Sequence, residues 1–190
     1  MAKLYFRYGT VGSAKTLNLL AVAHNYRQQG KQVLLIKPAL DDRFGKGSIK
    51  SRAGLEMAAD ILVTSETDLL LREFEGIDCV LVDEAQFLPG AVIDQLREIS
   101  LVKRIPVICY GLRTDFRSNL FEASKRLMEL ADSIEEVKAT CFFCTKKSIM
   151  NIRHLNGVAT LDGPVVQVGA EESYFPVCYG CYVGQLKVVV

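Results

Sequence analysis

The first 135 residues of the chain alternate short, unbroken apolar runs with longer stretches of helical periodicity. Strands that are apolar throughout are typical of a parallel sheet covered on both faces, and strands separated by helices form βαβ units. This alternation predicts an α/β domain with a mostly parallel sheet and a ligand site at the carboxyl ends of its strands. The predicted strands are Leu4–Tyr8, Gln32–Ile36, Ile61–Val63, Cys79–Val82 and Ile105–Tyr110.

The stretches between these runs carry apolar residues at helical spacing. They predict helices at Lys15–Gln29, at Thr67–Phe74, after Pro89 as far as Ile99, and at Phe121–Ala131. From about Lys138 the helical period disappears. There we predict short strands at Ile149–Leu155 and Val165–Val168, with a hairpin turn at Asn156-Gly157.

Composition excludes several classes of protein. The chain has 190 residues, of which 49% are hydrophobic, and a formal net charge of +1, so it has no overall field to attract nucleic acid. No apolar run approaches the roughly 18 residues of a membrane-spanning helix. The first residues lack the features of a signal peptide. We therefore expect a cytoplasmic protein with no membrane and no nucleic acid among its partners.

The segment between the first predicted strand and helix has the order of a Walker A phosphate loop. Backbone N–H groups there cradle phosphate oxygens, a lysine adds a positive charge, and a hydroxyl holds Mg²⁺. The alternative is an ordinary strand-to-helix turn in which Ser13 caps the helix and the lysine is incidental. The segment reads Gly9, Thr10, Val11, Gly12, Ser13, Ala14, Lys15 and Thr16.

Ala14 occupies the position before the lysine where a glycine is usual. If that position requires a positive φ, the methyl group costs roughly 1 kcal/mol. If it requires only space beside a phosphate, alanine is tolerated.

A second motif supports nucleotide binding. The apolar run Cys79–Val82 ends in Asp83-Glu84, the form of a Walker B element. Asp83 is placed to hold Mg²⁺ together with Thr16, and Glu84 is placed to act as a general base towards a hydroxyl or water. A solvated loop glutamate is the alternative for Glu84. The two motifs together predict a P-loop NTPase-like fold for residues 1–137.

Four of the six cysteines form two Cys-x-x-Cys pairs near the C-terminus, whereas Cys79 and Cys109 stand singly in apolar runs. Four thiolates suit a closed, structural zinc site, which would stabilise a small β-rich module over residues 138–190. A redox pair would start a thioredoxin-like helix, which neither pair is expected to do. The long segment between the pairs is a candidate lid, in which Phe175 either reaches a ligand or packs around the metal. The predicted zinc ligands are Cys141, Cys144, Cys178 and Cys181.

Taken in order, these motifs resemble those of the type II, zinc-containing thymidine kinases, cytosolic enzymes of deoxynucleotide salvage. The resemblance rests on the phosphate loop, on Asp83–Pro89, on Tyr110–Arg117 and on the two cysteine pairs, and it covers nearly the whole chain. It implies transfer of the γ-phosphoryl group of Mg·ATP to the 5′-hydroxyl of thymidine. It also implies a homotetramer, or in some members a dimer.

The resemblance assigns roles residue by residue. Glu84 corresponds to the catalytic base, and Asp83, Gln86 and Arg52 join the phosphate loop in the ATP site. A solvated surface arginine is the alternative for Arg52. Core packing is the alternative for Phe87, Leu112, Phe116 and Phe121. The chain departs from the family pattern at Val11, Ala14 and Ala85. The residues assigned to the thymidine pocket are Phe87, Leu112, Phe116, Phe121 and Tyr174.

Two other functions fit part of the sequence. A P-loop ATPase moving on nucleic acid would hydrolyse ATP faster with a polynucleotide, which the near-neutral charge does not favour. A non-catalytic nucleotide sensor, weakened at Ala14, would bind ATP without turnover.

Overall fold

The computed structural model describes residues 1–43, 45, 47–165 and 173–186. Its larger part is a six-stranded sheet with the order β5-β2-β6-β7-β1-β8, in which every neighbouring pair is parallel. The predicted parallel α/β architecture is therefore confirmed. The strands are β1 (Leu4–Tyr8), β2 (Val33–Pro38), β5 (Ile61–Val63), β6 (Cys79–Val82), β7 (Val107–Gly111) and β8 (Ser133–Glu136).

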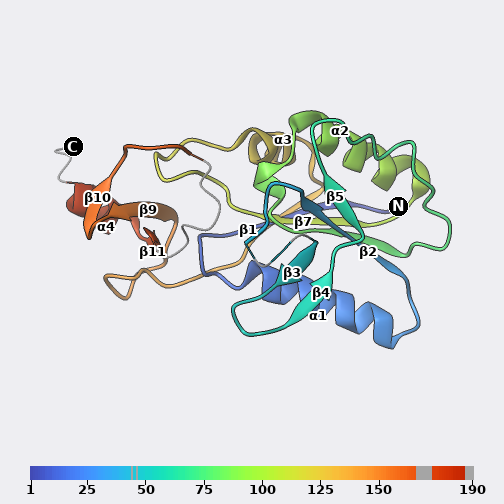
Figure 1. The fold of residues 1–190 in the computed structure, drawn as a ribbon, viewed down its shortest axis with the longest axis horizontal. Coiled ribbons are helices and arrows are strands. Elements are labelled where there is room, and N and C mark those ends of the chain that lie inside the picture. Colours follow the sequence, from blue (N-terminus) through green and yellow to red (C-terminus); the bar gives the residue numbers. More distant parts are fainter. Residues whose placement is uncertain (44, 46, 166–172, 187–190) are drawn as a thin grey trace.

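Helices cover both faces of this sheet. Helix α1 (Lys15–Gln28) lies on one face, and α2 (Gly90–Glu98) and α3 (Glu122–Leu130) lie on the other (Figure 1). The central strand β6 shows why its sequence is apolar throughout. Cys79 and Leu81 pack into the core on the α1 side, whereas Val80 and Val82 pack into the core on the α2 and α3 side.

The smaller part is a three-stranded antiparallel sheet of β9 (Met150–Leu155), β10 (Val158–Thr160) and β11 (Tyr174–Val177), followed by helix α4 (Tyr179–Leu186). Asn156 and Gly157 join β9 to β10 with φ values of 51° and 79°. Positive φ at both positions is the geometry of a type I′ turn, so the predicted hairpin is confirmed. The module has its own core, which includes Ile152 and Val177.

Several predicted elements differ from the structure. Thr67–Phe74 is a series of turns rather than a helix. The Asp68 side chain accepts a hydrogen bond from the Leu70 N–H, and the Gln95 side chain accepts one from the Leu69 N–H. These side chains replace the helical partners of the backbone. Val165 lies outside any strand, and the remainder of the predicted strand Val165–Val168 lies outside the described residues.

Several elements were not predicted. The strands β3 (Ser48–Lys50) and β4 (Glu56–Ala58) form a hairpin beside α1, β8 adds an edge to the main sheet, and α4 follows the second cysteine pair. Helix α2 continues into a wider π-helical turn over Ile99–Lys103. None of the helices in the described ranges is long and apolar enough to cross a membrane.

Candidate active site

The phosphate loop joins β1 to α1 at the carboxyl edge of the parallel sheet. The Lys15 side chain is buried, and its Nζ donates hydrogen bonds to the Thr10 carbonyl at 2.7 Å and to Ser13 Oγ at 3.3 Å. Gly9 packs so closely that an added Cβ would lie 2.4 Å from Ser13 Oγ. Ala14, not Ser13, is the cap residue of α1, and no side chain caps the helix. The structure thus contradicts the alternative of a serine-capped turn with an incidental lysine.

Ala14 has φ 65° and ψ 24°, in the left-handed region. Of the two alternatives for this position, the structure shows the one that requires a positive φ. A left-handed L-residue costs roughly 1–2 kcal/mol because its Cβ crowds the following carbonyl oxygen. The loop holds alanine in a conformation that glycine adopts without that cost.

Replacing Ala14 by Gly is expected to increase the free energy of unfolding by roughly 1 kcal/mol, because the substitution removes this steric cost. For a chain of this size the melting temperature should rise by roughly 2–4 °C. Differential scanning calorimetry measures the change. Ala21→Gly, on α1 at an exposed position, is the matched control and should lower the melting temperature. Equal decreases in the melting temperatures of Ala14→Gly and Ala21→Gly would show that the left-handed geometry of Ala14 does not reduce stability.

Asp83 lies at the end of β6 and faces the start of α1. The Thr16 hydroxyl lies 3.1 Å from each of its carboxylate oxygens. A threonine hydroxyl and a carboxylate, both beside a phosphate loop, are the protein ligands that Mg²⁺ uses with nucleotides. These two side chains could therefore hold the ion.

Glu84, the next residue, has φ 48° and is also left-handed. Its Oε1 accepts a hydrogen bond from Arg43 Nη2 at 2.6 Å, and its Oε2 accepts one from Gln86 Nε2 at 2.5 Å. The Gln86 Oε1 in turn accepts a hydrogen bond from the Leu112 N–H at 3.0 Å. Glu84 is thus held at both oxygens, which contradicts the alternative of a solvated loop glutamate. Gln86 contacts this carboxylate and the Leu112 backbone; its assignment to the ATP site remains a prediction.

Arg43 extends these contacts into the interior. Its Nε donates to Asp41 Oδ1 at 2.5 Å, and the other Asp41 oxygen lies 3.0 Å from Lys37 Nζ. Lys37 and Asp41 are both buried. Alternating positive and negative charges therefore connect β2 to Glu84 and orient the carboxylate from behind.

The buried charges have shifted pKa values. Burial, reinforced by the negative charge of Glu84, raises the pKa of Asp83 to about 7. Burial also lowers the pKa of Lys15 to about 8, against the opposing effect of the two carboxylates. Burial alone would raise the pKa of Glu84, but Arg43 and Lys15 outweigh it and lower that pKa. Glu84 is therefore ionised at neutral pH.

The raised pKa of Asp83 predicts a pH-dependent stability. Its ordinary pKa is 3.8, so the folded protein binds this proton more tightly than the unfolded chain. The stabilising contribution is present below about pH 4 and is lost as the pH rises to about 7. Removing the titrating group in Asp83→Asn should therefore flatten the melting-temperature profile of the ligand-free protein between about pH 4 and 7. If the melting-temperature profiles of the unsubstituted protein and Asp83→Asn coincide, the raised pKa of Asp83 is contradicted.

A cavity of about 280 Å³ opens beside these charged groups. It is lined by Val11–Thr16, Asp83 and Glu84. All the residues assigned to the thymidine pocket line it too, as do Gln86 and Arg52. Arg52 lies near the phosphate loop, since a Cβ added to Gly12 would be 4.0 Å from its Nη1. Of the predicted site residues in the α/β part, Gly9 and Thr10 do not line the cavity. The members of the predicted pocket are Phe87, Leu112, Phe116, Phe121 and Tyr174.

Sequence reasoning missed Asp41, Arg43 and Asn151, which also line the cavity. Asp41 and Arg43 follow directly after β2, which lies beside β6 in the sheet. Polar residues after a central parallel strand are candidates for the ligand site, and that rule could have found both. Asn151 is the second residue of β9, and its position depends on how the small module packs.

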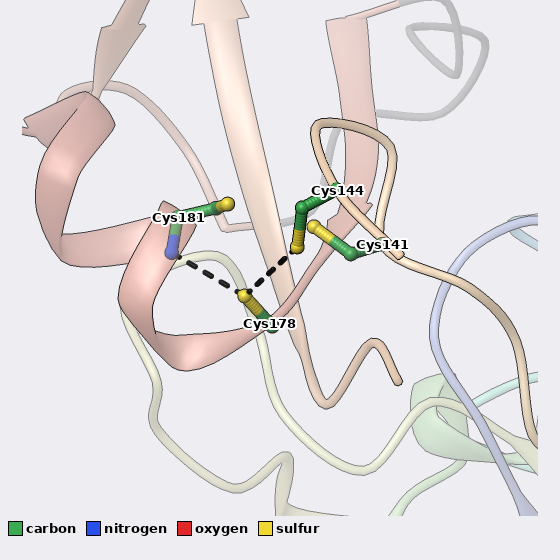
Figure 2. Close-up of side chains that lie close together, drawn as sticks. All are labelled: Cys141, Cys144, Cys178 and Cys181. Atoms are coloured by element: carbon green, nitrogen blue, oxygen red, sulfur yellow. Dashed lines mark hydrogen bonds between the residues drawn. The ribbon is translucent and has the colours of Figure 1, made fainter. Parts of the chain in front are cut away.

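The four paired cysteines converge at one point, as Figure 2 shows, with all their sulfur atoms within 4.8 Å of one another. The Sγ atoms of Cys144 and Cys178 are 3.7 Å apart. This separation is too long for a disulfide bond and is close to the roughly 3.8 Å edge of a tetrahedron with Zn–S bonds of about 2.3 Å. The sulfur-only donor set fits zinc, so the predicted zinc ligands lie together. Neither cysteine pair was expected to start a helix. That expectation was wrong for the second pair, because Cys181 lies in the first turn of α4.

Comparison with known proteins decides the family. The profile described as thymidine kinase matches residues 2–182. The chain belongs to the thymidine kinase family. The thymidine kinase of Lactiplantibacillus plantarum is 44% identical over 180 residues, covering 94% of each chain. That of Streptococcus pyogenes serotype M28 is 42% identical over 181 residues, covering 94% of this chain and 95% of the relative. The resemblance identified in the sequence is confirmed.

A thymidine kinase of Lactobacillus acidophilus is 43% identical over 189 residues and covers 94% of each chain. Among solved structures, the Pif1 helicase of Candida albicans superposes with a TM-score of 0.43 at 14% identity. That match covers 72% of this thymidine kinase family member and 36% of the helicase. No functional argument rests on so remote a similarity. Membership of a kinase family, with an ATP-dependent phosphotransfer activity, replaces the two other functions that fitted part of the sequence.

Proposed function

We propose that this chain transfers the γ-phosphoryl group of Mg·ATP to the 5′-hydroxyl of thymidine, giving ADP and dTMP. The observation that carries the proposal is one cavity lined both by a phosphate loop with two carboxylates and by a group of aromatic side chains, the aromatic wall. A nucleoside with its base against the aromatic wall would direct its sugar towards Glu84. The names of the relatives agree with this choice of acceptor.

At the phosphate end, the chain supplies positioning and charge. The backbone N–H groups at the start of α1 and the Lys15 ammonium are placed to bind phosphate oxygens. Thr16 and Asp83 would hold Mg²⁺, which would supply positive charge to the phosphate groups. The transition state of phosphoryl transfer has little bond formation for the protein to assist. Alignment by these groups therefore provides most of the catalysis.

Glu84 is proposed to accept the proton of the attacking hydroxyl. Its low pKa keeps it ionised, and the hydrogen bonds from Arg43 and Gln86 fix the direction in which its carboxylate points. As the new P–O bond forms at the 5′-oxygen, the proton passes to a carboxylate oxygen. Arg43 and Gln86 therefore act as positioning residues for the base.

The aromatic wall is proposed to bind the base. Phe87 and Phe121 meet edge to face at 5.7 Å between ring centroids, and Phe116 and Tyr174 pack at 6.0 Å. Tyr174 comes from β11, so the small module closes one side of this pocket. Closure over the acceptor would exclude water, which otherwise competes for the phosphoryl group.

We also propose a structural Zn²⁺ held by the four cysteines, a cytoplasmic location, and self-association into a homotetramer or dimer. Four thiolates leave no open coordination position, so the metal would cross-link the module rather than take part in the reaction. Light scattering during size-exclusion chromatography measures the oligomeric state.

The test of the function is ADP release from Mg·ATP by the zinc-loaded protein. We expect strong stimulation by thymidine and none by uridine or by a polynucleotide. Product analysis should show dTMP in equal amount to ADP. Stimulation by a polynucleotide, or ADP release that ignores thymidine, would contradict the proposal.

A further inference from the structure

The cavity wall at Thr114–Arg117 takes much of its support from the small module rather than from the domain that carries it in sequence. Arg117 Nε and Nη2 donate to the carbonyls of Leu161 and Gly163 at 2.8 and 2.6 Å. Asn151 Nδ2 donates to the Thr114 carbonyl at 3.0 Å. Leu161 and Gly163 belong to the segment after β10, and Asn151 belongs to β9, so two parts of the module reach the wall.

Tyr182 makes a further buried link to this wall. It lies in α4 directly after Cys181, and its backbone N–H donates to the Cys178 carbonyl at 2.9 Å. Its side chain is 7% exposed and packs in the core of the module with Ile152 and Val177. Its hydroxyl donates a hydrogen bond of 2.7 Å to the Phe116 carbonyl.

Phe116 is the residue of this wall that the proposed function assigns to the pocket for the base. It is 2% exposed, and its ring lines the cavity against Tyr174. The guanidinium carbons of Arg117 and Arg153 lie 5.2 and 5.5 Å from the ring centroid. Fixing the Phe116 carbonyl fixes the Cα from which the ring projects, so the Tyr182 hydroxyl sets how far the ring enters the cavity.

We propose that Tyr182 is a positioning residue for the nucleoside acceptor, acting through Phe116. This inference rests on the proposed function, because it specifies how the acceptor end of that same cavity is built. The phosphate loop is held by contacts that do not involve Tyr182. Lys15 bonds within the loop and Thr16 bonds to Asp83. The small module reaches the loop through Ser148, whose hydroxyl lies 2.9 Å from Thr10 Oγ1, and through Asn151 Oδ1, which accepts a hydrogen bond of 2.9 Å from the Val11 N–H. Loss of the Tyr182 hydroxyl therefore affects acceptor binding selectively.

Tyr182→Phe is the decisive variant. It keeps the ring and the apolar packing but leaves the Phe116 carbonyl buried without this donor. We expect the KM for thymidine, and the thymidine Kd measured by calorimetry without ATP, to rise about tenfold, roughly the effect of one lost hydrogen bond. The KM for ATP, kcat and bound zinc should stay within about twofold. Tyr179→Phe, in the same helix but 54% exposed, is the matched control and should change none of these.

Two results would overturn the proposal. One is an unchanged thymidine Kd in Tyr182→Phe. The other is an equal rise in the KM values of both substrates together with loss of zinc, which would mark Tyr182 as a structural residue only. The unsubstituted protein is measured first. If it shows no thymidine-dependent ADP release, the proposed function fails, whereas a failure confined to Tyr182→Phe concerns this inference alone.

Discussion

Replacing Glu84 by Gln is expected to lower kcat by about 10²-fold or more, because the amide cannot accept the proton of the acceptor hydroxyl. The neutral side chain also fits its surroundings less well. One of its ends would place an NH₂ group against Arg43 or Gln86, both of which donate to the carboxylate. ATP binding should change little, because Lys15 and the loop N–H groups are intact. Single-turnover kinetics and calorimetric titration with ATP measure the two effects.

Glu98→Gln is the matched control for this variant. Glu98 lies at the end of α2 and is exposed, so the same chemical change there should leave turnover unaltered. If Glu84→Gln turns over as fast as Glu98→Gln, Glu84 is not the base. A parallel loss of ATP binding would instead place Glu84 among the nucleotide-binding residues.

Replacing Cys144 by Ser is expected to remove bound zinc and to unfold the small module. The module's core is small, and a structural four-thiolate site supplies about 10–16 kcal/mol of apparent binding free energy. Because Tyr174, Asn151 and Tyr182 all reach the acceptor end of the cavity from this module, thymidine-dependent ADP release should disappear. Zinc stoichiometry by atomic emission and a melting curve measure the first effect.

Thr145→Ser, at the exposed neighbouring position, is the control and should retain one zinc per chain. A Cys144→Ser protein with full zinc content and an unchanged melting curve would show that the metal does not hold the module together. Removal of zinc from the unsubstituted protein with a chelator should reproduce the loss of activity.

The sequence predicted the central strands well because both faces of the sheet are covered, so their residues must be apolar in an unbroken run. The prediction from sequence failed for the edge strand β8 and for helix α4. Strand β8 reads Ser-Ile-Glu-Glu and lies at the edge of the sheet, where Ile134 and Glu135 are exposed, so its sequence lacks the unbroken apolar run of the central strands. Helix α4 contains Gly180 and Gly184, which disfavour a helix in isolation. In α4, packing against the rest of the protein overrides this low helix propensity.

The site was predicted where it follows from local order along the chain. The phosphate loop and Asp83-Glu84 need only a strand with a helix or a turn after it, and their short-range geometry is encoded by neighbouring residues. The pairing of Arg43 with Glu84 joins residues 41 positions apart. Tyr182 reaches Phe116 across 66 positions. Such contacts depend on how whole elements pack, which no periodicity in the sequence reveals.

The strand order has a consequence for how the protein is made. Among the strands of this sheet β1 leaves the ribosome first, yet its two neighbours are β7 and β8. Leu4 pairs with Val107, and Tyr5 pairs with Ser133. At a synthesis rate of about 5–20 residues per second, β1 waits roughly 5–20 s for its first partner. Until then the nascent chain carries an apolar strand with both edges unpaired, so the period of greatest exposure to aggregation precedes the synthesis of β7.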